Sequence, residues 1–564
     1  MYLRTTSQKR KDGSKLTHLQ IAESYWNAEK KRSENRIVYN CGRADDPEVI
    51  ERMRQLAKSI LRRCPPDEIV TDHPGWRVVD AWQYGPTYVL EVLWERLGIR
   101  RIIEKKARSR RFKFAVERAL FAMVANRACA PSSKLYCWEE WLERDVRIEG
   151  TEGLELQHLY RAMDFLEANK EEIEREIFFH VCDLLNADVD LVFYDTTSLH
   201  FEVDEEDRGL GDDDLVRGSE AAGKKKYKAP RKRGHSKNGR GDAPQIVVGL
   251  AVTRDGIPIR HWVFSGNTVD VTTVKQVKQD LRGWKLGRCV FVGDAGMVSA
   301  ANLRQLARGG GKYIVCMPVQ PGNEVSTQVL TRPGRYQTVA DNLRVKEVTV
   351  GDGERRRRYV VCHNPEEEKR QNQHRAELIQ KLEAELASLG DCCTKTAHSK
   401  RVCALRSSKR FGRYVRFTKA GKPTINRAAI REAERHAGKF VVHSNDDTLS
   451  AEDMALGYKQ LMRVEQAWRM LKSGLKMRPV FHWAPHRIHA HVSIAVLSLL
   501  LERVSEVACE DTWRNVRDDL EQVKLVQLIG PDGELWQTTE PAARARSRLK
   551  SLKIDNPPLV VNLR

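Results

Sequence analysis

The sequence predicts an α/β protein built on a mixed β-sheet with helices on its faces. Short apolar runs rich in β-branched residues begin near residue 190, and Asp255-Gly256, a hairpin turn signal, joins two of them. Later runs of this kind alternate with helix-like segments. Consecutive strands followed by alternating helices and strands form a mixed sheet that is covered by helices.

Composition narrows the class of protein further. The 564 residues include 97 Lys and Arg against 77 Asp and Glu, a formal net charge of +20. This balance favours a nucleic-acid partner, because cationic side chains along phosphates release counterions; a merely basic or ribosome-associated protein is the alternative. The polar start lacks a signal peptide and segment 492–501 is too short to span a bilayer, so we expect a cytoplasmic protein without a membrane partner.

Residues 1–185 are predicted to form a helical, basic N-terminal region that binds DNA. Segment 114–127 is a helix-like run, and apolar residues repeat at helical spacing in 156–166 and 173–184. Eight of the fourteen residues from Arg100 to Lys113 are Lys or Arg. Such a stretch suits a DNA backbone and an ordinary solvated face equally well.

Residues 186–319 are predicted to form the first part of the catalytic core. The expected strands are 191–194, 245–252, 257–264, 289–292 and 313–317, and the expected helices are 272–281 and 299–307. This order places three meandering strands before the alternating part of the sheet.

Residues 320–437 interrupt that alternation and are predicted to be an inserted, strand-containing subdomain. Strand-like runs at 343–350 and 358–362 precede a charged helix that carries a leucine stripe. Residues 438–480 return to the core, with a strand at 439–443 and one long helix from Ala451 to Lys476 that Pro479 ends. Residues 481–564 are predicted to be a C-terminal helical region.

Two aspartates follow apolar strands of the predicted core. Asp195 ends the first strand and Asp294 comes just beyond the fourth. Neighbouring strands lie about 4.8 Å apart, so adjacent strand ends can bring two carboxylates to one metal pair. Mg²⁺ and Mn²⁺ favour oxygen ligands, and a pair of such ions supports phosphodiester chemistry. A lone aspartate at such a position is usually a turn or cap residue, but two in equivalent positions favour a site.

A third acid, Glu465, lies on the predicted long helix. Tyr458, Glu465 and Lys472 are spaced by seven residues, which is close to two helical turns and places them on one face. Leu461, Val464, Trp468, Leu471 and Leu475 form the apolar stripe of the same helix. Glu465 lies at the edge of that stripe, and Lys472 could hold a phosphate nearby; ordinary flanking charges are the alternative.

These residues resemble the insertion-sequence transposases of the DDE, ribonuclease-H-like superfamily. The resemblance is to the branch with a Tyr-x2-Arg-x3-Glu-x6-Lys signature and a β-rich insertion before the glutamate. Here the signature is Tyr458, Glu465 and Lys472, with Leu461 in place of the arginine. Further similar stretches are His235-Ser236-Lys237 with Gln245, Gly266-Asn267-Thr268 with Asp270, and Arg478-Pro479-Val480-Phe481-His482.

The resemblance implies a ribonuclease-H-like core in which Asp195, Asp294 and Glu465 are catalytic and hold two Mg²⁺ or Mn²⁺ ions. It also implies cleavage of transposon ends, transfer of the 3′-hydroxyl into target DNA, and an insertion that helps to hold the DNA end. We expect a homodimer on DNA, no small-molecule cofactor, and a place in the bacterial nucleoid.

A basic loop is the predicted DNA contact closest to the acids. Residues 224–240 hold nine Lys or Arg and no acid. The preceding run 202–214 carries eight acids that could mask the loop when no DNA is bound, but an unstructured, solvated segment is the favoured interpretation. The predicted DNA-binding residues are Tyr458, Lys472, Arg469, Lys224, Lys225, Lys226, Arg231, Lys232 and Arg233.

Two other functions remain open at the level of sequence. One is a ribonuclease-H-like nuclease that cleaves without strand transfer, and the other is an inactive DNA-binding derivative. The second is disfavoured because all three acids are present. Neither the histidines between 482 and 491 nor the cysteines between 392 and 403 have the spacing of a standard zinc module.

Overall fold

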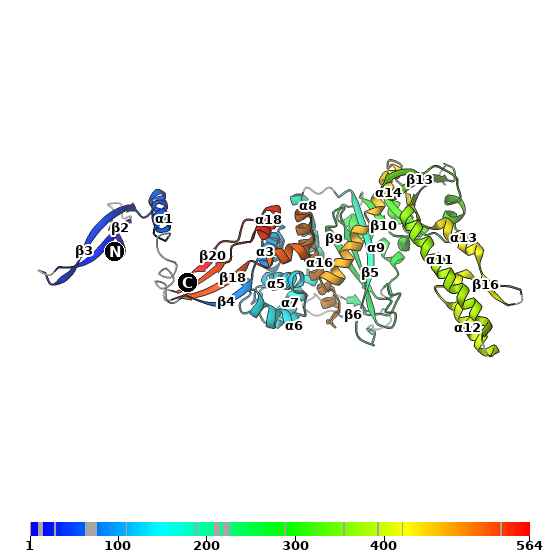
Figure 1. Cartoon of the computed structure of the whole chain (residues 1–564), viewed down its shortest axis with the longest axis horizontal. Helices are drawn as coiled ribbons and strands as arrows, with labels where there is room; N and C mark the ends of the chain where they lie inside the picture. The colour runs from blue at the N-terminus through cyan, green and yellow to red at the C-terminus, as the bar shows by residue number, and fades with distance from the viewer. Residues whose placement is uncertain are drawn as a thin grey trace. The chain divides into compact units, whose positions relative to one another are not determined.

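The structure is a computed structural model of the chain. It describes all residues except 1, 10–14, 28–29, 62–75, 109, 186–188, 208–214, 218–225, 238, 287–288, 321, 354–355, 392–393, 420, 531–532 and 564. The chain divides into two compact units, Met1–Ala81 with Val526–Gln537 and Val560–Arg564, and Trp82–Leu525 with Thr538–Leu559. Figure 1 labels the elements of both units.

A nine-stranded mixed sheet forms the centre of the larger unit (Figure 1). β5 pairs antiparallel with β8, and β8 with β9, whereas β10 and β11 run parallel to β5. This confirms the predicted ribonuclease-H-like mixed sheet. The strands in spatial order are β12 (Gln337–Ala340), β13 (Leu343–Val350), β14 (Arg357–His363), β17 (Lys439–Ser444), β11 (Tyr313–Met317), β10 (Val290–Gly293), β5 (Leu191–His200), β8 (Gln245–Val252) and β9 (Pro258–Ser265).

Helices cover both faces of this sheet, because its central strands are apolar on both sides. All eight residues of β8 are buried. One face packs on α9 (Asp270–Gly283) and α10 (Ala300–Ala307). The other packs on α14 (Ala451–Lys459), α15 (Met462–Arg469) and α16 (Pro485–Cys509).

The predicted long helix from Ala451 to Lys476 is wrong as a single element. α14 ends at Lys459, a turn at Gln460 and Leu461 follows, and α15 passes into a π-helical segment, η8 (Met470–Gly474). At the junction, Leu461 and Arg463 donate to carbonyls three residues back, which is the tighter 3₁₀ pattern. The predicted apolar stripe is confirmed, since its five residues are all buried in the core.

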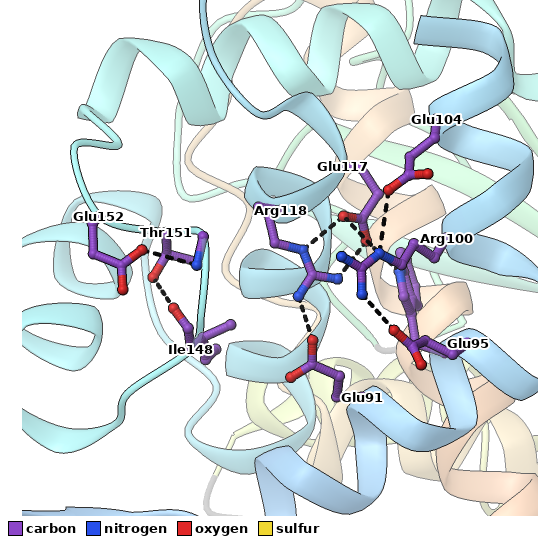
Figure 2. A network of polar contacts seen from close by, with 11 residues as sticks. Glu91, Glu95, Arg100, Glu104, Glu117, Arg118, Ile148, Thr151 and Glu152 are labelled. Carbon is purple, nitrogen blue, oxygen red and sulfur yellow. Dashed lines mark hydrogen bonds and ion pairs between the residues drawn. The ribbon is translucent and has the colours of Figure 1, made fainter. Parts of the chain in front are cut away.

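The predicted helices between residues 85 and 185 form a bundle whose core also includes residues of α16 and of the segments 513–520 and 545–549. Figure 2 shows a polar network within it, in which the buried Arg118 contacts Glu117 and Glu91. Trp94 donates to Glu117 at 2.7 Å, so the network also fixes a core tryptophan. The elements are α3 (Gly85–Arg96), α4 (Ile99–Ala107), α5 (Val116–Cys129), α6 (Lys134–Tyr136), η1 (Cys137–Asp145), α7 (Leu156–Ala168) and α8 (Lys170–Leu185).

The start of the chain is not helical, which corrects the prediction for residues 1–185. β1 (Tyr2–Lys9), β2 (Lys15–Asn27) and β3 (Arg32–Arg43) form an antiparallel sheet, followed by α1 (Pro47–Leu61) and β4 (Arg77–Gln83). Leu19 and Ile21 alternate with His18 and Gln20 at the two-residue period of a strand. The helical stripes that led to the prediction all lie after residue 110.

The insertion and the C-terminal region also differ from the prediction. β12, β13 and β14 extend the central sheet, so the separate core of the insertion is mostly helical and packs around Leu378, Leu382 and Leu405. This core is built from α11 (Pro365–Ala387), η6 (Ser388–Asp391), α12 (Lys395–Ser407), η7 (Gly412–Tyr414), β15 (Val415–Phe417), β16 (Pro423–Ile425) and α13 (Arg427–His436).

The C-terminal region carries strands as well as helices. The helices α16, α17 (Trp513–Leu520) and α18 (Ala543–Ser551) fit the prediction. β18 (Lys524–Gly530), β19 (Gly533–Thr538) and β20 (Val560–Leu563) form a sheet in the order β20-β19-β18-β4. Within the described part of the chain, no helix is long and apolar enough to cross a bilayer.

Candidate active site

The register of the sheet places Asp195 and Asp294 side by side. Gly293, the last residue of β10, pairs with Tyr194 of the parallel strand β5. Asp294 and Asp195 are the next residues of the two strands, so they lie level at the point where β10 stops. The predicted end of the first strand at Tyr194 is wrong, because β5 continues to His200 with β8 as its partner.

Both aspartates belong to the face of the sheet that carries α14 and α15. Side chains alternate along a strand, so Asp195 shares a face with Phe193, and Asp294 with Val292. Phe193 and Val292 are buried in the same core cluster as Val464 of α15. α15 also packs directly against β5.

Burial of Asp195 changes its acidity. Its side chain is 21% exposed. Burial, together with the charges of Asp294 and Asp270, raises the pKa of Asp195 to about 6, whereas the positive charge of Lys237 opposes the increase. Carboxylates that repel one another in a partly buried position favour binding of a cation.

Lys237 and Asp270 complete this cluster from two other segments. The Lys237 ammonium donates to the Thr196 carbonyl at 2.7 Å and lies 2.9 Å from Asp270 Oδ2 and 3.8 Å from Asp195 Oδ1. Thr196 donates from its hydroxyl to Asp270 Oδ1 at 2.5 Å. The sequence prediction missed both roles, although both residues lie in stretches that carry the family resemblance.

Gln245 holds those two stretches together. Its buried side chain donates to the carbonyls of His235 at 3.1 Å and Gly266 at 2.9 Å. A Cβ at Gly266 would lie 1.9 Å from the Gln245 carbonyl oxygen, so only glycine permits this approach. The segments bearing Lys237 and Asp270 are therefore fixed next to β5.

Tyr458 and Lys472 approach the aspartates from the helical segment above them. The Tyr458 hydroxyl donates to Asp294 Oδ1 at 3.1 Å. Burial raises the pKa of Tyr458, and Cys316 and Asp294 add to the increase, so the hydroxyl keeps its proton. Burial lowers the pKa of Lys472, and the charge of Lys237 lowers it further, whereas the charge of Asp195 raises it. The Lys472 side chain therefore lies within electrostatic reach of Asp195.

Glu465 lies on α15 with an exposed side chain, on the face of the sheet that carries Asp195 and Asp294. Among the described residues, no group of three His, Cys, Asp or Glu side chains is gathered closely enough to hold a metal ion. The structure thus brings the two aspartates together, and the role of Glu465 stays a prediction.

The basic loop is described in part. Lys224 and Lys225 lie outside the described residues, as does the side chain of Lys226, although β7 (Lys226–Lys228) pairs with β6 (Leu215–Arg217). The basic residues of the loop remain predicted DNA contacts.

The acidic run preceding the loop pairs with the described arginines. Arg231 is buried and donates to Asp207 Oδ1 at 2.8 Å, and its guanidinium lies 4.6 Å from the Trp483 ring centre. Arg233 is 44% exposed and lies 3.7 Å from Glu206. Lys232 forms a β-bridge with Gln245. The sequence left open whether the acidic run masks the loop or is an unstructured, solvated segment; in the described residues, Asp207 and Glu206 of this run contact Arg231 and Arg233.

Arg469 lies apart from the acids. It lines a hollow of about 640 Å³ together with Arg463, Arg503 and Asp255. Asp255 is in the turn between β8 and β9, beyond the amino end of β5, whereas Asp294 lies level with Asp195 in the middle of that strand. The predicted DNA contact of Arg469 would thus be separate from the acid cluster.

The two aspartates that the sheet brings level are suited to a divalent metal. Asp195 and Asp294 offer only oxygen donors, which Mg²⁺ and Mn²⁺ prefer. The ammonium of Lys237 already lies near Asp195 and Asp270, so the position is one that accepts a cation.

Comparisons with known proteins identify the family of the chain. A family model of the transposase DDE domain matches residues 206–501, and one of the N-terminal domain of IS1634 family transposases matches residues 3–68. No curated protein matches the chain. Among solved structures, a cryo-EM structure of the piggyBac transposase synaptic complex with hairpin DNA matches at a TM-score of 0.32 and 10% identity, over 78% of this chain and 79% of that one. Since the DDE model spans more than half of its residues, the chain belongs to the DDE transposases, metal-dependent enzymes that cleave DNA and transfer its strands.

Proposed function

We propose that Asp195, Asp294 and Glu465 hold two divalent ions, Mg²⁺ or Mn²⁺, in this transposase. The observation that supports this site is the common face of the sheet. Register and strand alternation put both aspartates on the side where α15 packs against β5, and α15 carries Glu465. A movement of the exposed glutamate side chain would bring a third carboxylate to the pair.

Bound ions would supply the activation of water or a 3′-hydroxyl and the stabilisation of the leaving oxygen. Two side chains next to the aspartates, those of Tyr458 and Lys472, would have different roles. Tyr458 holds Asp294 in one orientation through its hydroxyl. Lys472, half-buried near Asp195, is placed to bind a phosphate of the DNA strand.

We further propose that the basic loop contacts the DNA backbone, with Lys232, Arg233 and Lys224 to Lys226 as the contributing side chains. The N-terminal part of the region 1–185 and the insertion 320–437 would hold the transposon end. An element has two ends, so a twofold homodimer on DNA would present one active site to each. Because its substrate is chromosomal DNA, the enzyme would act in the bacterial nucleoid.

Glu465→Gln tests the proposed site on a plasmid that carries an element end. We expect cleavage in Mg²⁺ to fall by about a hundredfold or more, the order of loss for one preorganised electrostatic contact, with DNA binding retained. Glu452→Gln is the matched control, because Glu452 is an exposed acid on the neighbouring helix α14. Normal cleavage by Glu465→Gln would exclude this glutamate from the site.

A further inference from the structure

Lys237 lies where a metal ion would meet Asp195. Its ammonium is 3.8 Å from Asp195 Oδ1 and 2.9 Å from Asp270 Oδ2, and it donates to the carbonyl and the hydroxyl of Thr196 at 2.7 and 2.8 Å. A lysine ammonium has three donors and a full positive charge. It therefore neutralises the acids and satisfies oxygens that a divalent ion would also seek.

This position is built into the fold. The Lys237 amide donates to Ser198 Oγ at 3.0 Å, and Gln245 ties the same loop to the segment of Asp270. Asp270 begins α9, and its two carboxylate oxygens contact Thr196 and Lys237. Asp270 therefore holds the Lys237 ammonium next to β5.

We propose that Lys237 competes with the divalent ion for Asp195, and that a DNA phosphate releases it. Asp270 is the positioning residue that holds the lysine in the DNA-free protein. This inference rests on the proposed metal site, because it assigns Asp195 as a ligand.

Charge gives the reason for the competition. A divalent ion bound to Asp195 and the Lys237 ammonium would repel each other strongly at such a separation. Lys237 belongs to the basic stretch 224–240, the proposed backbone contact, so an arriving phosphate offers the ammonium another anion. DNA binding then strengthens metal binding, and by linkage the metal strengthens DNA binding by the same factor.

Mn²⁺ binding to the full-length protein tests this coupling, measured by electron paramagnetic resonance with and without a DNA duplex of the element end. Lys237→Gln removes the charge but keeps a hydrogen-bond donor, and Lys237→Arg keeps the charge. Lys275→Gln is the matched control, since it removes a positive charge from the exposed face of α9, the helix that Asp270 begins.

For Lys237→Gln without DNA, we expect about tenfold tighter Mn²⁺ binding, equivalent to about 1.4 kcal/mol, and a loss of the effect of DNA. The Lys237→Arg and Lys275→Gln proteins should bind Mn²⁺ with the affinity of the wild type, and the DNA duplex should increase that affinity in both. The competition would be refuted if a folded Lys237→Gln protein bound Mn²⁺ as weakly as the wild type or more weakly. It would also be refuted if the DNA duplex left the Mn²⁺ affinity of the wild type unchanged.

Asp195→Asn separates failure of this inference from failure of the proposed site. If Asp195→Asn abolishes Mn²⁺ binding but Lys237→Gln does not tighten it, only the competition is wrong. If Asp195→Asn binds Mn²⁺ normally, the metal site itself is wrong and the inference falls with it.

Discussion

Replacing Asp195 by asparagine should stabilise the metal-free protein while it abolishes cleavage. Burial, Asp294 and Asp270 raise the pKa of this carboxyl from 3.8 to about 6. The difference of about two pKa units, at 1.36 kcal/mol each, means that the ionised group costs the folded state about 3 kcal/mol at neutral pH. Asparagine carries no charge, so Asp195→Asn should raise the free energy of unfolding by that order.

The pH dependence follows from the direction of the shift. A carboxyl with a raised pKa holds its proton more tightly in the folded protein than in the unfolded chain. Wild-type stability should therefore decrease, relative to Asp195→Asn, as the pH rises from about 4 to about 6, and the difference should stay constant above that. Below about 4 both states are protonated and the two proteins should unfold alike.

Calorimetric unfolding in EDTA, repeated between pH 4 and 8 in one ionic strength, measures this difference directly. Asp341→Asn is the control, because Asp341 is an exposed acid in the turn between β12 and β13. The reasoning is refuted if Asp195→Asn is no more stable than the wild type at pH 7.5, or if its advantage does not change with pH. Plasmid cleavage by the same variant in Mg²⁺ must be lost, with end binding retained.

Two further substitutions test contacts around the site and in the helical bundle. Tyr458→Phe removes the hydroxyl bound to Asp294; single-turnover cleavage should slow about tenfold, the cost of one lost hydrogen bond to a charged group, with melting temperature unchanged. Arg118→Met leaves Glu117 without its buried partner and should lower the free energy of unfolding by about 3 kcal/mol in urea. Arg144→Met, which breaks an exposed ion pair with Glu140, should change it by less than about 1 kcal/mol. An equal effect of both arginine substitutions would contradict the role of the network in Figure 2.

The core sheet was predictable because its strands are buried on both faces. β8 was predicted at its observed bounds, since apolar β-branched runs between turn residues have few other uses. β13 was also predicted at its observed bounds, from β-branched residues that are interspersed with charged ones. The N-terminal strands were missed because they bury few residues: within β3, for example, most side chains are exposed. A two-residue alternation without a core gives a weak pattern beside the strong helical stripes that follow it.

The site was predictable only where a functional residue follows an apolar run of the sheet. Asp195 and Asp294 come after apolar runs, and the sheet brings them level. Lys237 and Asp270 come from a loop and a helix start, whose approach depends on the side chain of Gln245 and the missing Cβ of Gly266. Contacts of that kind depend on tertiary geometry, which no local periodicity encodes.

The break in the predicted long helix changes what the signature residues do. In one continuous helix, Tyr458, Glu465 and Lys472 would project from a single line along the face. The turn at Gln460 and Leu461 separates Tyr458 from Glu465, and η8 changes the helical phase before Lys472.

Tyr458 can therefore bind Asp294, while Lys472 lies within reach of Asp195. Glu465 lies between them in sequence, on the element that packs against β5. The two outer signature residues thus bracket the aspartate pair. The carboxylate of Glu465 would approach both aspartates from α15, whereas Lys237 comes from the loop before β8. The glutamate and the lysine therefore reach Asp195 from different segments, and the lysine can leave while the glutamate binds the metal.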